Sequence, residues 1–235
     1  HAKLRGAIAI GFAAWQRHDG RHYLSADTAT FAASFEAPTP RDSPATRIEL
    51  EELLALQASR TAAQVAAARA DRKTDIERFY PALGLDPKNA PDLPHLHRLA
   101  ERVEDDVRIY VRAVKERFRR LRPYEIEPRI VACIDDVRGD LSYPSGHAAY
   151  AYAIASVLVA MVPERAAALE SRAREFARQR MMCGVHFPSD LDAGRTAAVR
   201  LVREMWTDQG FVADLAAARS ELRAAMGMQL IRAVD

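Results

Sequence analysis

The chain has 235 residues, enough for one sizeable hydrophobic core but short for two domains of ordinary size. Hydrophobic residues make up 49% and charged residues 28%, which is ordinary for a globular protein. The net charge is only +2, so the composition excludes the strong overall charge expected of a protein that binds nucleic acid or an anionic membrane surface.

The N-terminal segment, residues 1–42, is the least regular part of the chain. Lys3 and Arg5 precede the stretch GAIAIGFAA, which resembles the charged and apolar regions of a secretory signal peptide. This apolar stretch has only 9 residues, so a mature amphipathic arm is the equal alternative. We therefore divide the chain into an arm over residues 1–42, including a candidate signal remnant, and a helical domain over residues 43–235.

The first helices of that domain are predicted from their start signals. Ser43 is suited to be an N-cap and Pro44 to be the first helical residue. Thr61 and Gln64 form a capping box that starts the next helix. The predicted apolar face of the first of these helices consists of Ile48, Leu50, Leu53 and Leu54.

The remaining pattern is also helical, which predicts an all-α, single-domain helical bundle. From Pro94, apolar residues recur at helical spacing until Pro123 stops the helix. A polar loop follows, and further helices are predicted over residues 146–162, 163–180, 189–206 and 211–226. The longest uncharged stretch, residues 148–162, is 15 residues long, short of the about 20 needed to span a bilayer. We therefore expect a buried core helix there.

Three short stretches concentrate groups that bind or attack an anion. In KERFRRLRP, Lys115 and Arg122 lie seven residues apart, so two helical turns would bring both to one face. In YPSGH, Ser145 is an N-cap and Gly146 lets a ligand approach the free N–H groups of a helix start, beside His147. A solvated basic helix face and an ordinary capped helix are the alternatives when each stretch is taken alone.

The third stretch, RQRMMCGVHFPSD, supplies Arg180, His186 and Asp190. Asp190 is placed to accept a hydrogen bond from Nδ1–H of His186, which would leave Nε2 as a neutral, oriented nucleophile. An incidental pair of a histidine and an aspartate is the alternative. The two cysteines, Cys133 and Cys183, fit no zinc-ligand spacing, and from spacing alone they are either free and buried or joined.

Taken together and in this order, the three stretches resemble the signature of the acid phosphatase and vanadium haloperoxidase superfamily, which includes the type 2 phosphatidic acid phosphatases. The chain is most similar to the bacterial class A nonspecific acid phosphatases, over most of residues 38–205. Two positions depart from the family pattern. Gln179 stands where the family commonly has Ser, and Leu141 with Ser142 stands where it often has Gly-Ser, which bears on rate and substrate preference.

The resemblance implies a metal-independent acid phosphatase without a cofactor, acting on small phosphate monoesters and, as a further candidate class, diphosphates. It implies that His186 attacks phosphorus to give a phosphohistidine, that Asp190 orients His186, and that His147 acts as acid and base. The implied phosphate-binding residues are Lys115, Arg122, Ser145, Gly146 and Arg180. It also implies inhibition by vanadate and a bell-shaped pH profile with an acidic optimum.

The resemblance further implies a disulfide between Cys133 and Cys183, a periplasmic or secreted location, and a homo-oligomer. No nucleic-acid binding and no membrane span are expected. Two alternatives share the same constellation of residues. One is a vanadium-dependent haloperoxidase, although such enzymes are generally much longer, and the other is a non-catalytic helical phosphate-binding protein.

Overall fold

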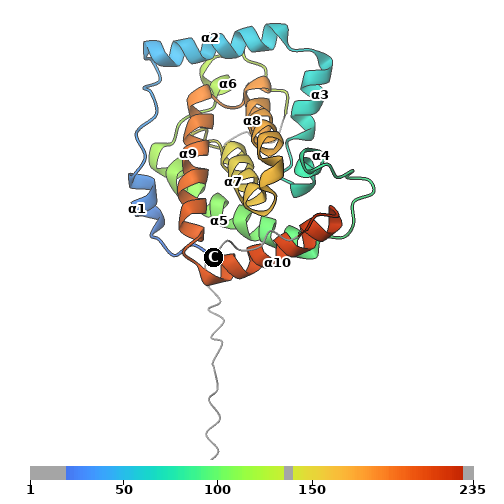
Figure 1. Ribbon diagram of the computed structural model, residues 1–235. Coiled ribbons are helices and arrows are strands. Elements are labelled where there is room, and N and C mark those ends of the chain that lie inside the picture. Colours follow the sequence, from blue (N-terminus) through green and yellow to red (C-terminus); the bar gives the residue numbers. More distant parts are fainter. Residues whose placement is uncertain (1–19, 135–139, 230–235) are drawn as a thin grey trace, which may run out of the picture.

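The computed structural model describes residues 20–134 and 140–229, and every regular element in these ranges is helical (Figure 1). The expected all-α fold is therefore confirmed. The helices, with η for 3₁₀ turns, are α1 (Thr28–Ala33), α2 (Pro44–Ser59), α3 (Ala62–Ala70), η1 (Ile76–Phe79), α4 (Tyr80–Leu83), α5 (Pro94–Phe118), α6 (Pro123–Ile126), α7 (Gly146–Met161), η2 (Pro163–Arg165), α8 (Ala166–Met182), α9 (Pro188–Met205) and α10 (Gln209–Ala225).

Helix α7 forms the centre of the bundle. It is apolar around most of its circumference, and a helix of this kind has to be buried on several sides. It packs against α5, α8, α9 and α10. In Figure 1, α2 lies across the top of the bundle and α10 along the bottom, with α8 and α9 running between them. The polar residues at the start of α7 are consequently surrounded by other helices.

The close approach of α9 to the first turn of α7 depends on Gly194. A Cβ atom at this position would lie 2.6 Å from the carbonyl oxygen of Ser145 and 2.9 Å from Cβ of Ala148, so a larger residue would separate the helices. The N–H of Ser145 also donates to the carbonyl oxygen of Asp190 at 2.9 Å. These contacts fix the starts of α7 and α9 against each other and so bring His147 and Asp190 into one region.

The predicted helix starts are confirmed at three positions. Ser43 caps α2, Thr61 with Gln64 forms the capping box of α3, and Ser145 caps α7. In each case the side-chain oxygen of the cap residue accepts a hydrogen bond from the backbone N–H three residues later. The signals are local, which explains why the sequence alone was sufficient.

Three expectations about helices were wrong or incomplete. Helix α5 ends at Phe118 rather than at Pro123, because Arg119 adopts a left-handed conformation with φ 48° and donates its N–H to the carbonyl oxygen of Lys115. Pro123 instead begins the short helix α6. Ile48 is 70% exposed and does not belong to the buried face of α2. Helix α1 was not predicted at all.

The described part of the N-terminal arm packs on α5. The buried carboxylate of Asp106 accepts backbone hydrogen bonds from His22, Tyr23 and Leu24 at 2.7 to 3.1 Å, and α1 packs on the same helix. The expected signal remnant falls in residues 1–19, outside the described residues.

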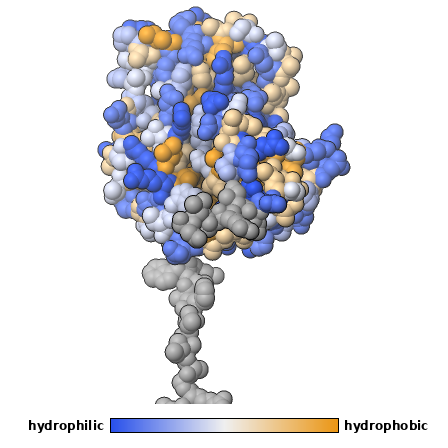
Figure 2. All heavy atoms as spheres, in the orientation of Figure 1, coloured by the Kyte–Doolittle hydropathy of each residue, from blue (hydrophilic) through white to orange (hydrophobic). Residues whose placement is uncertain are grey.

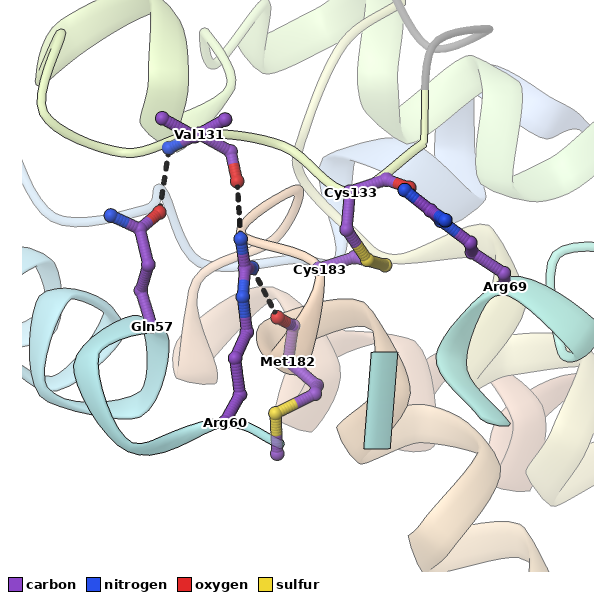
Figure 3. Close-up of a disulfide and its surroundings, with 7 residues drawn as sticks. All are labelled: Gln57, Arg60, Arg69, Val131, Cys133, Met182 and Cys183. Carbon is purple, nitrogen blue, oxygen red and sulfur yellow. Dashed lines mark hydrogen bonds between the residues drawn. A yellow bond between two sulfur atoms is a disulfide. The ribbon is translucent and has the colours of Figure 1, made fainter. Parts of the chain in front are cut away.

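A disulfide joins Cys133, in the loop before α7, to Cys183 at the end of α8 (Figure 3). Arg60 reinforces the junction by donating to the carbonyl oxygens of Val131 at 3.0 Å and Met182 at 2.8 Å. A crosslink between residues 50 apart in sequence restricts the unfolded chain and is worth about 4 kcal/mol in the loop-entropy model. The loop is therefore attached to the helix that carries Arg180.

The face of the molecule shown in Figure 2 mixes hydrophilic and hydrophobic residues. Across residues 20–134 and 140–229, the search for a helix with the length and apolar character of a membrane span finds none.

Candidate functional site

A pocket of about 580 Å³ opens between α5, the start of α7, the end of α8 and the loop residues Arg122, Asp140 and His186. Six of the residues predicted for the site line it, namely Lys115, Arg122, Gly146, His147, Arg180 and His186. Two others, Ser145 and Asp190, are fully buried behind its wall. The pocket therefore gathers residues that are up to 71 positions apart in the sequence.

Three buried cations dominate the electrostatics of the pocket. Arg122 and Arg180 are 2% and 1% exposed, and Lys115 is also buried. Burial, followed by the charge of Arg122, lowers the pKa of Lys115 to about 8. Cations that are desolvated and close to one another are stabilised by an anion placed between them. The pocket is therefore suited to a group with more than one negative charge.

The carboxylate of Asp140, which was not predicted, contacts two of these cations. Its oxygens lie 2.9 and 3.1 Å from Nζ of Lys115, and Oδ2 lies 2.5 Å from the guanidinium of Arg122. Burial opposes ionisation of Asp140, but the two cations outweigh it and lower its pKa. The side chain is nonetheless 54% exposed, so this carboxylate is a partner that solvent and ligands can reach.

His186 is held in one tautomer by its two neighbours. Its Nε2 lies 2.6 Å from an N–H of Arg122, and a guanidinium can only donate, so Nε2 accepts and carries no proton. Its Nδ1–H lies 3.2 Å from Oδ2 of Asp190. Burial, followed by the charge of Arg122, lowers the pKa of His186 well below its ordinary value. The ring is therefore neutral, with the Nε2 lone pair on the pocket side.

Asp190 is fixed by more than its histidine. Its Oδ2 also accepts from Oγ of Ser142 at 2.5 Å and from the N–H of Phe187 at 2.9 Å, and its Oδ1 accepts from Arg120 at 2.7 Å. The carboxylate is fully buried, and several donors are needed to keep a buried charge stable. The orientation of His186 is thus set by a saturated hydrogen-bond network.

His147 faces the pocket from the first turn of α7. Its Nε2 lies 2.7 Å from the carbonyl oxygen of Arg72, which can only accept, so Nε2 carries the proton and Nδ1 is left for exchange. The ring stacks on Phe176 at 6.2 Å. Burial, followed by the charge of Arg180, lowers the pKa of His147 to about 3. With no anion in the pocket, this histidine is neutral.

The start of α7 contributes less backbone to the pocket than expected. The N–H of Ser145 is already used by Asp190, and its hydroxyl oxygen accepts from Ala148, so of this residue the hydroxyl proton remains for a ligand. Gly146 does line the pocket, and a Cβ atom there would have only Val111 within 4 Å, at 3.8 Å. The first-turn N–H of Gly146 is the accessible backbone donor.

Metal-ligating side chains are not gathered in the described part of the chain: no group of three or more His, Cys, Asp or Glu residues there could hold a metal ion. The described residues that bring positive charge to the pocket are Lys115, Arg122 and Arg180, with Arg108 and Arg112 also in the lining, and the start of α7 adds the positive end of its dipole.

Comparison with known proteins places this geometry in a family. Residues 107–212 match the model of the PAP2 superfamily. A non-specific acid phosphatase of Salmonella typhi is 31% identical over 201 residues, covering 81% of this chain and 80% of that protein. The chain belongs to the PAP2 superfamily, with non-specific acid phosphatases among its relatives, and it is a phosphatase. A second relative, the non-specific acid phosphatase of Providencia stuartii, is 32% identical over 61% of this chain and 59% of its own length.

A solved structure supports the fold of the PAP2 protein. The crystal structure of a transmembrane PAP2-type phosphatidylglycerolphosphate phosphatase from Bacillus subtilis has a TM-score of 0.51 to this chain, covering 77% of it and 90% of the solved chain. At 18% sequence identity, the similarity concerns the helical arrangement alone.

Three residues that contact the site were missed from the sequence. Asp140 lies in a polar loop without a recognisable pattern. Arg120 stands in the run RRLRP, where nothing distinguishes it from its neighbours, and Ser142 was noted only as a departure from the family pattern. No local signal could have identified them, because their contacts with Asp190 and the pocket cations are made through tertiary packing.

Proposed function

We propose that this PAP2 protein hydrolyses phosphate monoesters in two steps through a phosphohistidine on His186. The observation that carries the proposal is the tautomer of His186. Its unprotonated Nε2 lies among the pocket cations, while its Nδ1–H is directed at Asp190. A neutral, oriented imidazole beside an anion-binding pocket is the arrangement that nucleophilic catalysis on phosphorus requires.

Binding would begin with the phosphoryl group replacing the carboxylate of Asp140. Lys115, Arg122 and Arg180 would then neutralise the phosphoryl oxygens, and the N–H of Gly146 with the hydroxyl of Ser145 would supply further donors. Preorganised donors of this kind stabilise the charge that develops in the transition state without reorganising during the reaction. This charge, which the chain provides itself, supports the proposal of a metal-independent reaction.

In the first step, Arg122 transfers its hydrogen bond from Nε2 of His186 to a phosphoryl oxygen. The freed Nε2 lone pair then attacks phosphorus while the bond to the ester oxygen breaks. His147 donates its Nδ1 proton to the leaving alkoxide, so that an alcohol departs. His186 becomes positively charged, and the carboxylate of Asp190 stabilises this charge through Nδ1–H. General acid catalysis of this kind contributes typically about 10²- to 10⁴-fold.

In the second step, water attacks the phosphohistidine and gives one proton to Nδ1 of His147. The bond between phosphorus and Nε2 breaks, and inorganic phosphate leaves. His147 must therefore be protonated before the first step, although burial and the charge of Arg180 lower its pKa to about 3. The negative charge of a bound phosphate opposes the three buried cations, so substrate binding raises the pKa of His147 and favours its protonation.

The outer wall of the pocket supports diphosphates as a further substrate class. Arg112 lies one helical turn before Lys115 on α5, and both line the pocket. Three residues of an α-helix span about 4.5 Å, so the guanidinium is placed to reach a second phosphate. We expect Arg112→Ala to raise KM for pyrophosphate more than for p-nitrophenyl phosphate, with Arg117→Ala as the exposed control on the same helix.

The disulfide supports a periplasmic or secreted location, because such bonds persist in oxidising compartments. We further propose that residues 43–235 form the phosphatase domain, with the preceding segment packed on it as an arm. The homo-oligomer stays a prediction from the family resemblance.

The decisive test is phosphate release from p-nitrophenyl phosphate by the wild-type chain and by His186→Ala. We expect the wild type to turn over, to be inhibited by vanadate and to be unaffected by EDTA, while the folded variant is inactive. Full activity of the variant would overturn the mechanism. Halide oxidation by hydrogen peroxide in the vanadate-loaded protein would favour the haloperoxidase alternative, and phosphate binding without turnover would favour a binding protein.

A further inference from the structure

Arg120 lies two residues before Arg122 in the sequence but serves the opposite side of His186. Arg122 contacts Nε2 of His186 on the pocket side, whereas Arg120 contacts Oδ1 of Asp190 on the buried side. Arg120 is 8% exposed and is absent from the pocket wall. The two arginines therefore bracket the same histidine and aspartate, one facing the ligand and one facing the protein.

Arg120 is the charged partner that complements Asp190 from behind. Asp190 uses Oδ2 for His186, while Oδ1 accepts from Nη1 of Arg120 at 2.7 Å. Burial raises the pKa of Asp190, and the charge of Arg120 is the strongest influence that opposes the rise. His186, Lys115 and Tyr143 are further titratable groups that interact with this carboxylate, and Glu49 faces Arg120 from α2. Without Arg120, a buried carboxylate would tend to take up a proton.

Arg120 is itself held by contacts from three directions. Its Nη2 donates to Oε2 of Glu49 at 2.8 Å, its Nη1 donates to Oγ of Ser189 at 2.8 Å, and its guanidinium lies 3.8 Å above the ring of Phe187. The other oxygen of Glu49 accepts from the backbone N–H of Ser189 at 2.8 Å, in the first turn of α9. A side chain from α2 thereby fixes both Arg120 and the helix that carries Asp190.

We infer that Arg120 is a positioning residue for the phosphatase reaction: it directs Oδ2 of Asp190 to His186 and keeps the carboxylate ionised, with Glu49 anchoring it from α2. This inference rests on the proposed function, in which His186 is the nucleophile. Arg120 acts through Asp190 and touches neither the substrate nor the reacting atoms.

The test is the pH dependence of p-nitrophenyl phosphate hydrolysis by Arg120→Gln, with Arg117→Gln as the control. Loss of the outer hydrogen-bond partner of a metal-bound histidine typically costs about 10- to 100-fold in activity. We expect a loss of the same order in kcat here, with KM close to the wild-type value. Because the positive charge favours ionised Asp190, its removal lets the Asp190–His186 pair take up the inactivating proton at higher pH. The acid limb of the profile should therefore move to higher pH.

A purely structural role would reduce the rate equally at every pH and leave the acid limb in place, and that result would overturn the inference. So would a folded Arg120→Gln with wild-type kcat. Arg120→Lys, which retains a charge without the fork of donors, should have a smaller shift of the acid limb. If the wild type itself fails to release phosphate, the proposed function is what fails.

Glu49→Gln keeps the inference testable if Arg120→Gln does not fold, because Glu49 lies at the outer end of the network. We expect the same lowering of kcat and the same direction of shift, both smaller than for Arg120→Gln. Glu51→Gln, on an exposed position of α2, is the matched control. An unchanged kcat and profile in folded Glu49→Gln would overturn the anchoring role of Glu49, and a wild-type kcat in folded Arg120→Lys as well would overturn the inference as a whole.

Discussion

The two sides of His186 carry opposite kinds of charge balance. On the buried side, Asp190 is matched by Arg120, Ser142 and a backbone N–H, and Arg120 is matched in turn by Glu49. On the pocket side, the buried cations Lys115 and Arg122 share one carboxylate, that of Asp140, which is half exposed. The charges on the buried side of the histidine are therefore balanced within the protein, whereas the positive charge on the pocket side is suited to being balanced by a bound anion.

Because of this difference, substitutions on the two sides of His186 should affect different kinetic constants. A buried network is rigid because each polar group would be expensive to leave unmatched, so changes in it should alter the chemistry rather than the binding. A partly exposed ion pair is worth little, so it can be exchanged for a phosphate. Variants in the buried network should lower kcat, and variants of the ion pairs on the pocket side should move KM. His147, which faces the pocket but transfers the proton, should affect kcat.

Asp190→Asn should have the largest effect among these variants. An amide can donate to His186 as readily as it accepts, so the histidine loses the tautomer with an unprotonated Nε2. The same change in a serine protease triad lowers kcat by about 10⁴-fold, and we expect a loss of that order with little change in KM. Steady-state kinetics with p-nitrophenyl phosphate measures both constants. A raised KM at unchanged kcat would contradict the division between the two sides.

His147→Ala should lower kcat by about 10²- to 10⁴-fold, with a loss that depends on the leaving group. An alkoxide needs a proton to depart, whereas p-nitrophenolate is stable without one. The loss should therefore be greater for an alkyl phosphate than for p-nitrophenyl phosphate. Equal losses for the two substrates would show that His147 does not act as the acid, and His95→Ala, at the distant start of α5, serves as the control.

Asp140→Asn should tighten the binding of inorganic phosphate about two- to fivefold, because it removes the carboxylate that competes for Lys115 and Arg122. Inhibition by phosphate during turnover reports the affinity. Glu116→Gln, on the same pocket wall but paired with Arg119, is the matched control. If Asp140 instead organised the two cations for binding, the substitution would weaken inhibition, and its role as a replaceable partner would be wrong.

The smallest expected effect is a change in the pKa of His147 on phosphate binding, which can be measured in the wild-type protein. Burial and the charge of Arg180 lower the pKa of His147 to about 3, and bound phosphate should raise it by opposing the cations. The positive ring is then favoured, so phosphate binding should be accompanied by proton uptake at this residue. Titration of the imidazole nitrogens by NMR, with and without phosphate, measures the shift. An unchanged pKa would show that phosphate binding does not favour protonation of His147.

Features encoded within a few residues were accessible from the sequence. The caps at Ser43 and Ser145 could be predicted because each depends on one side chain and a backbone N–H three residues away. The spacing of His186 and Asp190 likewise brings their side chains within 3.2 Å, because His186 lies two residues before α9 and Asp190 lies in its first turn.

Features that depend on packing were not accessible in this way. Arg120 and Glu49 form an ion pair although they lie 71 residues apart in the sequence. Arg119, which ends α5 before Arg120, adopts a left-handed conformation that the sequence does not indicate, because the residue is not a glycine. The role of Gly194 could not be predicted from the sequence either, because only the close approach of α7 shows why a side chain is excluded at this position. The sequence thus predicted the groups on the pocket side better than the network behind them.

The central claim is that Nε2 of His186 is the atom that receives the phosphoryl group. The most direct measurement is mass spectrometry of the wild-type protein quenched in base during turnover of p-nitrophenyl phosphate, with His186→Ala treated in parallel. We predict a phosphoryl group on the peptide that contains His186 and none in the variant. A phosphoryl group on a different residue, or undiminished turnover by the folded variant, would contradict the claim.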